Sequence, residues 1–216
     1  MKPAILFLTA CFSFSLLSGC QAAYYSAWEK LGVEKREILV DRVESAKDAQ
    51  EDAQAQFKDA LTQLSELITF DGGDLQTTYD ALQDQYDASR SSADRVTGRI
   101  SKIEAVADAL FSEWEMELNQ YSNESLRRKS EQQLRSTERR YQRLLRAMRQ
   151  AESSMQPVLH TLKDNVLFLK HNLNASAIGA LQGELTQIQQ EINVLIKEMN
   201  QSIAQSNDFI QLLKQS

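Results

Sequence analysis

Mostly apolar residues recur along this chain with alternating spacings of four and three residues, and this pattern constrains the fold more than any other feature. The first series begins at Leu39 and ends at Leu67, with Gln50 as its only polar member. Three further series run through residues 75–114, 134–173 and 178–213. Sustained heptads of this kind indicate helices that each bury one stripe against other helices.

The heptads are interrupted at three places, which predict the connections between helices. The sequence DGGD at residues 71–74 supplies Gly to end one helix and Asp74 to cap the next. No series continues through residues 121–125, where Ser122 or Asn123 is a candidate cap, and residues 174–176 make the last connection. The breaks predict helices near 24–70, 75–121, 124–173 and 176–214, each on the order of 55–75 Å long.

Short connections make consecutive helices antiparallel neighbours. The sequence therefore predicts an all-α fold, an elongated antiparallel four-helix coiled-coil bundle. The alternative is a three-helix coiled coil with a kinked third helix and one detached segment. Pro157 is expected to kink or split the third helix, because proline lacks the amide donor and clashes with the preceding turn. With only 7 Gly and 2 Pro in 216 residues, the composition agrees with helix.

The N-terminus predicts a secreted and lipid-anchored protein. Residues 1–19 have the features of a signal peptide, with Lys2 before an apolar run that is too short to span a bilayer as a helix. The sequence LSGC that ends at Cys20 resembles the lipobox of bacterial lipoproteins. In that class the signal is cut before the cysteine, which then carries lipid. The alternative is ordinary cleavage after small residues, with Cys20 merely part of the signal segment.

On the lipoprotein interpretation, residues 20–23 are a lipidated cysteine and short tether, and residues 24–216 form the helical coiled-coil domain. Gln21 after the cysteine favours the periplasmic face of the bacterial outer membrane, by analogy with lipoprotein sorting. The chain's other cysteine, Cys11, leaves with the signal. We therefore expect no disulfide, no cysteine metal site and no cysteine nucleophile.

The stretch YYSAWEKLGVEKREILVDRVESAKDAQ, residues 24–50, resembles the opening of an uncharacterised family of Gram-negative bacterial lipoproteins known as domain of unknown function 2959. The resemblance covers essentially the whole mature chain. It implies a helical domain of this length behind a lipid anchor. It implies no activity, substrate or active-site residue.

Motifs of enzymes are missing from the sequence, which contains no Gly-rich phosphate loop, no GxSxG and no HExxH. His160 and His171, the two histidines, lie roughly 16 Å apart along one helix, so one metal ion cannot bind both. We expect no catalysis, no cofactor and no metal; a hydrolase of envelope polymers is the third hypothesis. Tyr79, Tyr86, Trp114 and Tyr141 fall on heptad positions and are expected in the core rather than in a ligand site.

Basic residues concentrate between positions 127 and 149 of an otherwise acidic chain, whose net charge is −6. The acidic balance argues against nucleic acid. One interpretation is an anionic-surface site for phospholipid or peptidoglycan, formed by Arg127, Arg128, Lys129, Arg135, Arg139 and Arg143. The other is pairing within the hairpin, in which Arg135, Arg139 and Arg143 meet Glu113, Asp108 and Glu104.

The leading hypothesis is a non-enzymatic, lipid-anchored periplasmic scaffold, spacer or adaptor with an envelope protein as partner. The alternative is a binding module that uses the basic helix at 127–149 to recognise an anionic envelope component. Tyr24, Tyr25 and Trp28 follow Cys20 closely; its three-residue tether reaches about 10 Å. These aromatic residues are expected either at the membrane interface or packed against the end of the bundle. The sequence does not predict an oligomeric state.

Overall fold

The computed structural model describes residues 34–68, 75–172 and 175–215. This part of the chain forms four long helices: α2 (Lys35–Ile68), α3 (Leu75–Leu118), α4 (Glu124–His171) and α5 (Ala175–Gln215). No strand occurs among the described residues. The all-α prediction is confirmed.

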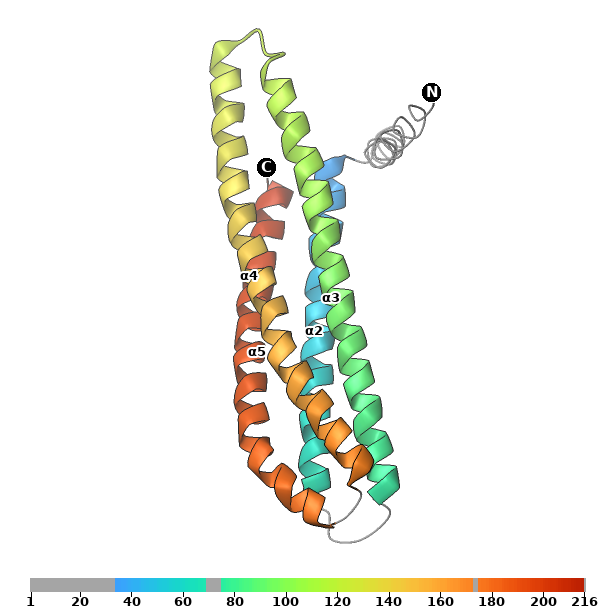
Figure 1. The fold of residues 1–216 in the computed structure, drawn as a ribbon. Helices are drawn as coiled ribbons and strands as arrows, with labels where there is room; N and C mark the ends of the chain where they lie inside the picture. Colours follow the sequence, from blue (N-terminus) through green and yellow to red (C-terminus); the bar gives the residue numbers. More distant parts are fainter. Residues whose placement is uncertain (1–33, 69–74, 173–174, 216) are drawn as a thin grey trace, which may run out of the picture.

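The helices run alternately up and down, and each packs against the next (Figure 1). Because α5 also packs against α2, the four helices form a closed square, in which α2 lies diagonally opposite α4. This arrangement confirms the antiparallel four-helix bundle. The three-helix alternative is wrong, since all four helices pack into one core.

One continuous hydrophobic core follows the heptad positions along the bundle. Fully buried side chains include Leu39, Val43, Ala46, Phe57 and Leu64 of α2, Val96, Ile100 and Ile103 of α3, Leu144, Met148 and Met155 of α4, and Ile188, Leu195 and Met199 of α5. Burial of each large aliphatic side chain stabilises the bundle by about 1.5–3 kcal/mol relative to exposure. The heptads thus provide most of what holds the four helices together.

The predicted ends of the second, third and fourth helices agree closely with the structure, whereas the first helix, expected from residue 24, begins at Lys35, with the described Glu34 outside it. Asn123 is the N-cap of α4: its Oδ1 accepts hydrogen bonds from the amides of Ser125 (2.9 Å) and Leu126 (3.2 Å). Helix α3 ends at Leu118, three residues before the predicted end. The predicted connection at 71–74 and the first helical turns predicted from 24 lie outside the described residues.

Helix α4 is not split at Pro157, contrary to part of the expectation for this residue. Pro157 is exposed, whereas its neighbours Val158 and Leu159 are buried. A proline on the outer side of a long helix removes one amide donor, but the carbonyl it leaves unpaired faces solvent and stays hydrated. The buried apolar residues before and after Pro157 keep α4 continuous through this position.

The hairpin of α3 and α4 extends beyond the start of α2 and the end of α5 (Figure 1). Lys35, the first residue of α2, bonds to Glu113 of α3 at 2.9 Å, and Arg36 donates to the carbonyl of Leu213 near the end of α5. Residues 114–136, here called the α3–α4 tip, lie past this level. Thr137 lies thirteen residues after Glu124 on α4, which makes the tip about 20 Å long.

Candidate functional site

The outer face of α4 carries a row of exposed arginines, here called the arginine row. Its members are Arg139, Arg140, Arg143 and Arg146. At 100° per residue Arg139, Arg143 and Arg146 lie within about 60° of one another, away from the buried stripe that contains Tyr141, Leu144 and Met148, and Arg140 lies at the edge of that stripe. Within the described part of the chain, none of the four guanidinium groups has a hydrogen-bond or ion-pair partner. The arginine row is therefore a concentrated positive surface.

The predicted pairing of Arg135, Arg139 and Arg143 with acids of α3 is wrong. Arg135 bonds to Glu131 on its own helix. Glu113 bonds to Lys35 instead, and Glu104 bonds to Arg149. Arg139 and Arg143 are exposed, and Arg143 lies beside Gln201 and Gln205 of α5 rather than against α3.

Arg149 marks the end of the basic segment and has a structural role. Its guanidinium bridges Glu152 of the same helix (2.6 Å) and Glu104 of α3. The hydrogen bond to Glu152 and then that to Glu104 raise the pKa of Arg149 above its ordinary value. This residue joins two helices and is not part of the exposed row.

A second basic group, here called the tip cluster, lies at the start of α4 and consists of Arg127, Arg128 and Lys129. Arg127 bonds to Glu124 at 2.9 Å, and Arg128 lies 3.5 Å from the same carboxylate. The hydrogen bond from Arg127 holds the pKa of Glu124 below its usual value. The first two turns of α4 thus carry three cations against Glu124, whereas Glu115 and Glu117 at the end of α3 and Glu131 of α4 bring the whole tip close to neutral.

Exposed apolar side chains accompany the tip cluster. Met116 is 64% exposed, Leu126 is 51% exposed and Tyr121 is 41% exposed. They stand on the last turn of α3, on the connection and on the first turn of α4. Cations beside exposed apolar groups are typical of surfaces that contact lipid headgroups or another protein.

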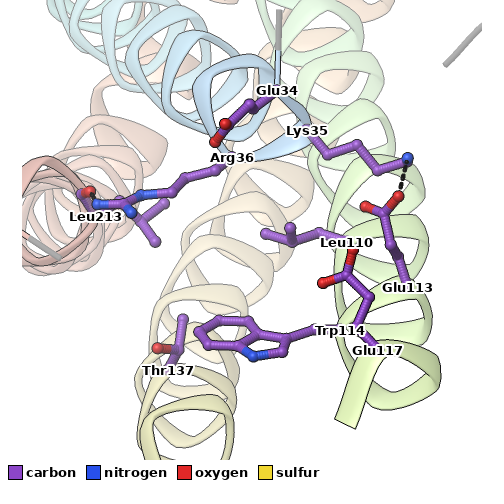
Figure 2. Close-up of a pocket in the computed structure, with 9 residues that line it drawn as sticks. All are labelled: Glu34, Lys35, Arg36, Leu110, Glu113, Trp114, Glu117, Thr137 and Leu213. Carbon is purple, nitrogen blue, oxygen red and sulfur yellow. Dashed lines mark hydrogen bonds and ion pairs between the residues drawn. The ribbon is translucent and has the colours of Figure 1, made fainter. Parts of the chain in front are cut away.

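A groove of about 340 Å³ lies where the tip passes the ends of α2 and α5. Figure 2 shows Leu110 and Trp114 extending from α3 towards Thr137 of α4 and Leu213 of α5. The indole Nε1 of Trp114 donates to Ser130 Oγ at 2.8 Å, which fixes the ring across the hairpin. The rim is polar and is formed by Glu34, Lys35, Arg36, Glu113 and Glu117.

The remaining predicted site residues are the two histidines, the aromatic residues at heptad positions, and the residues around Cys20. His160 and His171 are exposed. Among the described residues no three His, Cys, Asp or Glu side chains lie close enough to hold a metal ion. Tyr141 is buried, while Tyr79, Tyr86 and Trp114 are half-buried against the core, as predicted for heptad positions. Cys20, Tyr24, Tyr25 and Trp28 lie outside the described residues.

Sequence reasoning missed the groove and the tip. The sequence held a signal for the groove and for the tip. The second predicted helix runs to residue 121 and the third begins at residue 124, so their hairpin is long, whereas the first heptad series begins only at Leu39. Since α3 and α4 have 44 and 48 residues and α2 has 34, part of the hairpin extends past the other helices that the structure describes. No described helix has both the length and the apolar character to cross a membrane.

Residues 24–213 match the family described as a protein of unknown function, DUF2959. No curated protein matches the chain.

Proposed function

We propose, from the premise that this chain belongs to the DUF2959 family, that it is a lipid-anchored, non-catalytic adaptor of the bacterial envelope. Lipid on Cys20 holds it at the periplasmic face of the outer membrane. The bundle carries the arginine row, which binds an acidic surface of an envelope protein.

The observation that supports this proposal best is the arginine row itself. Four exposed guanidinium groups lie within about two turns of α4 without any partner in the described structure. Arginine forms paired, directional hydrogen bonds with carboxylates, and it is enriched where proteins recognise one another. Arg139 lies about 20 Å and Arg146 about 30 Å along α4 from Glu124, so the row stands clear of a membrane at the tip.

Photo-crosslinking in intact cells tests the adaptor. A photoreactive residue replaces Gln142, which is exposed between Arg139 and Arg143. The matched control places it at Ala55, which is exposed on α2 across the bundle. We expect a recurrent protein adduct at 142 that is absent at 55 and is lost when all four arginines of the row become Gln. Equal labelling at the two positions, or only glycan adducts at 142, would contradict the adaptor.

The anchor has its own test. We expect Cys20→Ser to leave an unprocessed precursor and to abolish incorporation of labelled fatty acid. Normal processing and membrane retention of this variant would refute the lipid anchor without affecting the crosslinking result.

A second function, binding of anionic phospholipid, is favoured by a different observation. The tip cluster lies at the projecting end of the bundle beside Met116, Tyr121 and Leu126, which are exposed. Each cation near an anionic membrane contributes about 1 kcal/mol. The tip is thus the part of the described molecule best suited to touch headgroups, while the arginine row is too far along α4 to do so.

A further inference from the structure

We propose that the partner which the arginine row binds is a helix of another envelope protein, and that this helix lies along α4 and α5 for about five turns. Its acidic side chains lie at the end nearest the α3–α4 tip, and its basic side chains lie at the other end. The inference rests on the proposed function and deepens it, because it states the chemistry and the orientation of the partner. Two hollows of opposite charge on one face of the bundle support it.

The first hollow, here called the arginine hollow, lies within the arginine row between α4 and α5. A volume of about 390 Å³ is bounded by Arg143, Arg146, Ala147, Gln201, Ala204 and Gln205. The two alanines leave the space, while the arginines and glutamines place hydrogen-bond donors around it. On α5, Glu198 and Asp208 lie three residues from Gln201 and Gln205, so the four arginines of the row keep this end positive.

The second hollow, here called the carboxylate hollow, lies farther from the tip between the same two helices and has a volume of about 360 Å³. Asp164 of α4 and Glu184 of α5 supply its negative charge, and Phe168, which is 39% exposed, gives it an apolar wall. Asn165 also lines this hollow; it is 4% exposed, and its side-chain nitrogen has no hydrogen-bond partner among the described residues. Lys163 lies about 100° away from Asp164 around α4, so this end stays negative.

Both hollows lie on the same side of α4, because a whole number of turns separates them. The residues that α4 contributes repeat after eighteen positions: Arg143, Arg146 and Ala147 in the arginine hollow, and Thr161, Asp164 and Asn165 in the carboxylate hollow. Eighteen residues are five turns of an α-helix, or about 27 Å. Arg146 and Asp164, which carry opposite charges, therefore occupy equivalent places at the two ends of this surface, here called the α4–α5 face.

The middle of the α4–α5 face is apolar. Val194 lies seven residues after Gln187 of the carboxylate hollow and seven residues before Gln201 of the arginine hollow, so these three residues share one side of α5. Val194 is 54% exposed. The charged hollows thus flank an apolar centre, which is the usual arrangement of a protein interface.

A helix is the partner structure that matches this spacing. An α-helix that runs alongside α4 has the same repeat, so residues eighteen positions apart on it meet the two hollows. Its carboxylates form paired hydrogen bonds with Arg143 and Arg146. A lysine or arginine five turns away reaches Asp164 and Glu184, with its apolar stem against Phe168. Reversal of the partner would place like charges together at both ends, so the face binds it in one orientation.

A second copy of this chain does not fit the face. Two copies turned end for end would bring the arginine hollow of one against the carboxylate hollow of the other. With the proposed lipid anchor, however, every copy stands on the membrane by the same end, so neighbouring copies are parallel. Parallel copies would meet with like hollows together, which their charges disfavour. The partner is therefore a different protein.

Photo-crosslinking of the full chain in intact cells tests the inference. A photoreactive residue replaces Gln201 in the arginine hollow or Gln187 in the carboxylate hollow, both of which are exposed. The matched control replaces Gln189, which is exposed at the level of Gln187 but lies about 160° away around α5. We expect the same partner at 201, at 187 and at 142, and no adduct at 189. Mass spectrometry should place the partner residues crosslinked at 201 and at 187 about fourteen positions apart, with acidic residues near the first and basic residues near the second.

Reversing the charge of the carboxylate hollow gives a second readout. We expect Asp164→Lys with Glu184→Lys to reduce the adduct at 187 about tenfold or more, because like charges then face each other. Asp84→Lys with Asp94→Lys makes the same change in net charge at exposed positions of α3 and should leave the adduct unchanged. Circular dichroism of the purified chains checks that both variants keep the bundle. Equal losses in the two variants would contradict a docked basic end.

The remaining outcomes separate this inference from the proposed function. Adducts at 142 without adducts at 187 would overturn the inference and leave the adaptor standing, since the partner would then contact the arginine row alone. Absence of the adduct at 142 as well would refute the adaptor, and the inference with it. Adducts whose crosslinked peptide comes from this chain would overturn the inference in favour of a second copy. A partner whose crosslinked residues lack the opposite charges would also overturn it.

Discussion

At the scale of single residues, Gln50 departs most clearly from the logic of the core. It occupies a heptad position of α2 and has no exposed surface. Its side-chain amide nitrogen and oxygen both lack a hydrogen-bond partner in the described structure. Ser89 and Ser202 are also buried with unpaired hydroxyl groups. Such groups lose the hydrogen bonds that water provides in the unfolded chain, which costs about 1–3 kcal/mol for each group.

We expect Gln50→Met to raise the free energy of unfolding by about 1–2 kcal/mol, because methionine has a similar shape and no polar atoms to desolvate. Urea denaturation measures the change. Gln54→Met is the matched control: Gln54 donates to Asn200 Oδ1 at 3.0 Å across α2 and α5, so its replacement gains nothing. Destabilisation by Gln50→Met would show instead that this amide fixes the register of the bundle.

Tyr141 provides a test of pH dependence. It is 2% exposed and packs against Phe111 and Phe209, with ring centroids 5.4 and 6.2 Å away. Burial, and to a smaller extent the charges of Asp108 and Glu104, raise the pKa of its phenol well above the ordinary value. The folded state therefore keeps the proton, whereas the unfolded state releases it near pH 10.

The resulting stabilisation is fully present below about pH 10 and is lost as the pH rises further, because only the unfolded chain then ionises at this position. We expect the melting temperature to fall with pH above that value, and Tyr141→Phe to make the fall less steep. Thermal melts of the two proteins across this range measure the difference. Parallel curves would mean that Tyr141 ionises equally in both states.

At the scale of helices, the buried apolar residues of α4 outweigh the helix-breaking tendency of Pro157. Pro157 lies inside a helix of 48 residues that continues to His171. Proline is about 3 kcal/mol less favourable than alanine inside a helix, partly offset because it restricts the unfolded chain. We expect Pro157→Ala to raise the free energy of unfolding by about 1–3 kcal/mol. Gln156→Ala, at the neighbouring exposed position, should change it little; equal effects would contradict this account.

The heptads predicted which face of each helix is buried, because that depends only on spacing within one helix. Leu144 and Met148, for example, are fully buried as expected. The ion pairs were wrong because they depend on the axial offset between two helices. The sequence predicted that Arg143 meets Glu104, but Arg149 occupies that level, six residues or about 9 Å farther along α4. No spacing rule fixes such an offset, which depends on the connection and on packing along the whole interface.

The groove was missed for a related reason. Its wall combines the first residues of α2, the last residues of α5 and the middle of the α3–α4 hairpin. These are brought together only by the relative lengths and offsets of four helices. The tip cluster, by contrast, is contiguous in sequence, so the concentration of Arg127, Arg128 and Lys129 was visible from the start.

At the scale of the whole molecule, the start of α2 and the α3–α4 tip lie at the same end of the bundle (Figure 1). Glu34 lies fourteen residues after Cys20, a reach of up to about 45–50 Å at full extension, whereas the tip extends about 20 Å past α2. With lipid on Cys20, as proposed above, this reach allows the anchor and the tip cluster to meet the same membrane surface. The arginine row then faces sideways, clear of the lipid.

This geometry predicts that the domain without its lipid binds anionic vesicles weakly and in a salt-sensitive way, because each basic residue contributes about 1 kcal/mol near the surface and screening removes it. Glu124 pairs with Arg127 and Arg128 and therefore reduces their attraction to the anionic headgroups. Changing Arg127, Arg128 and Lys129 to Gln should abolish co-sedimentation with vesicles that contain phosphatidylglycerol. Changing Arg139, Arg140 and Arg143 to Gln removes the same charge from the arginine row and should leave most of the binding. Equal losses in the two triple variants would mean that net charge, rather than the position of the tip, governs contact with the membrane.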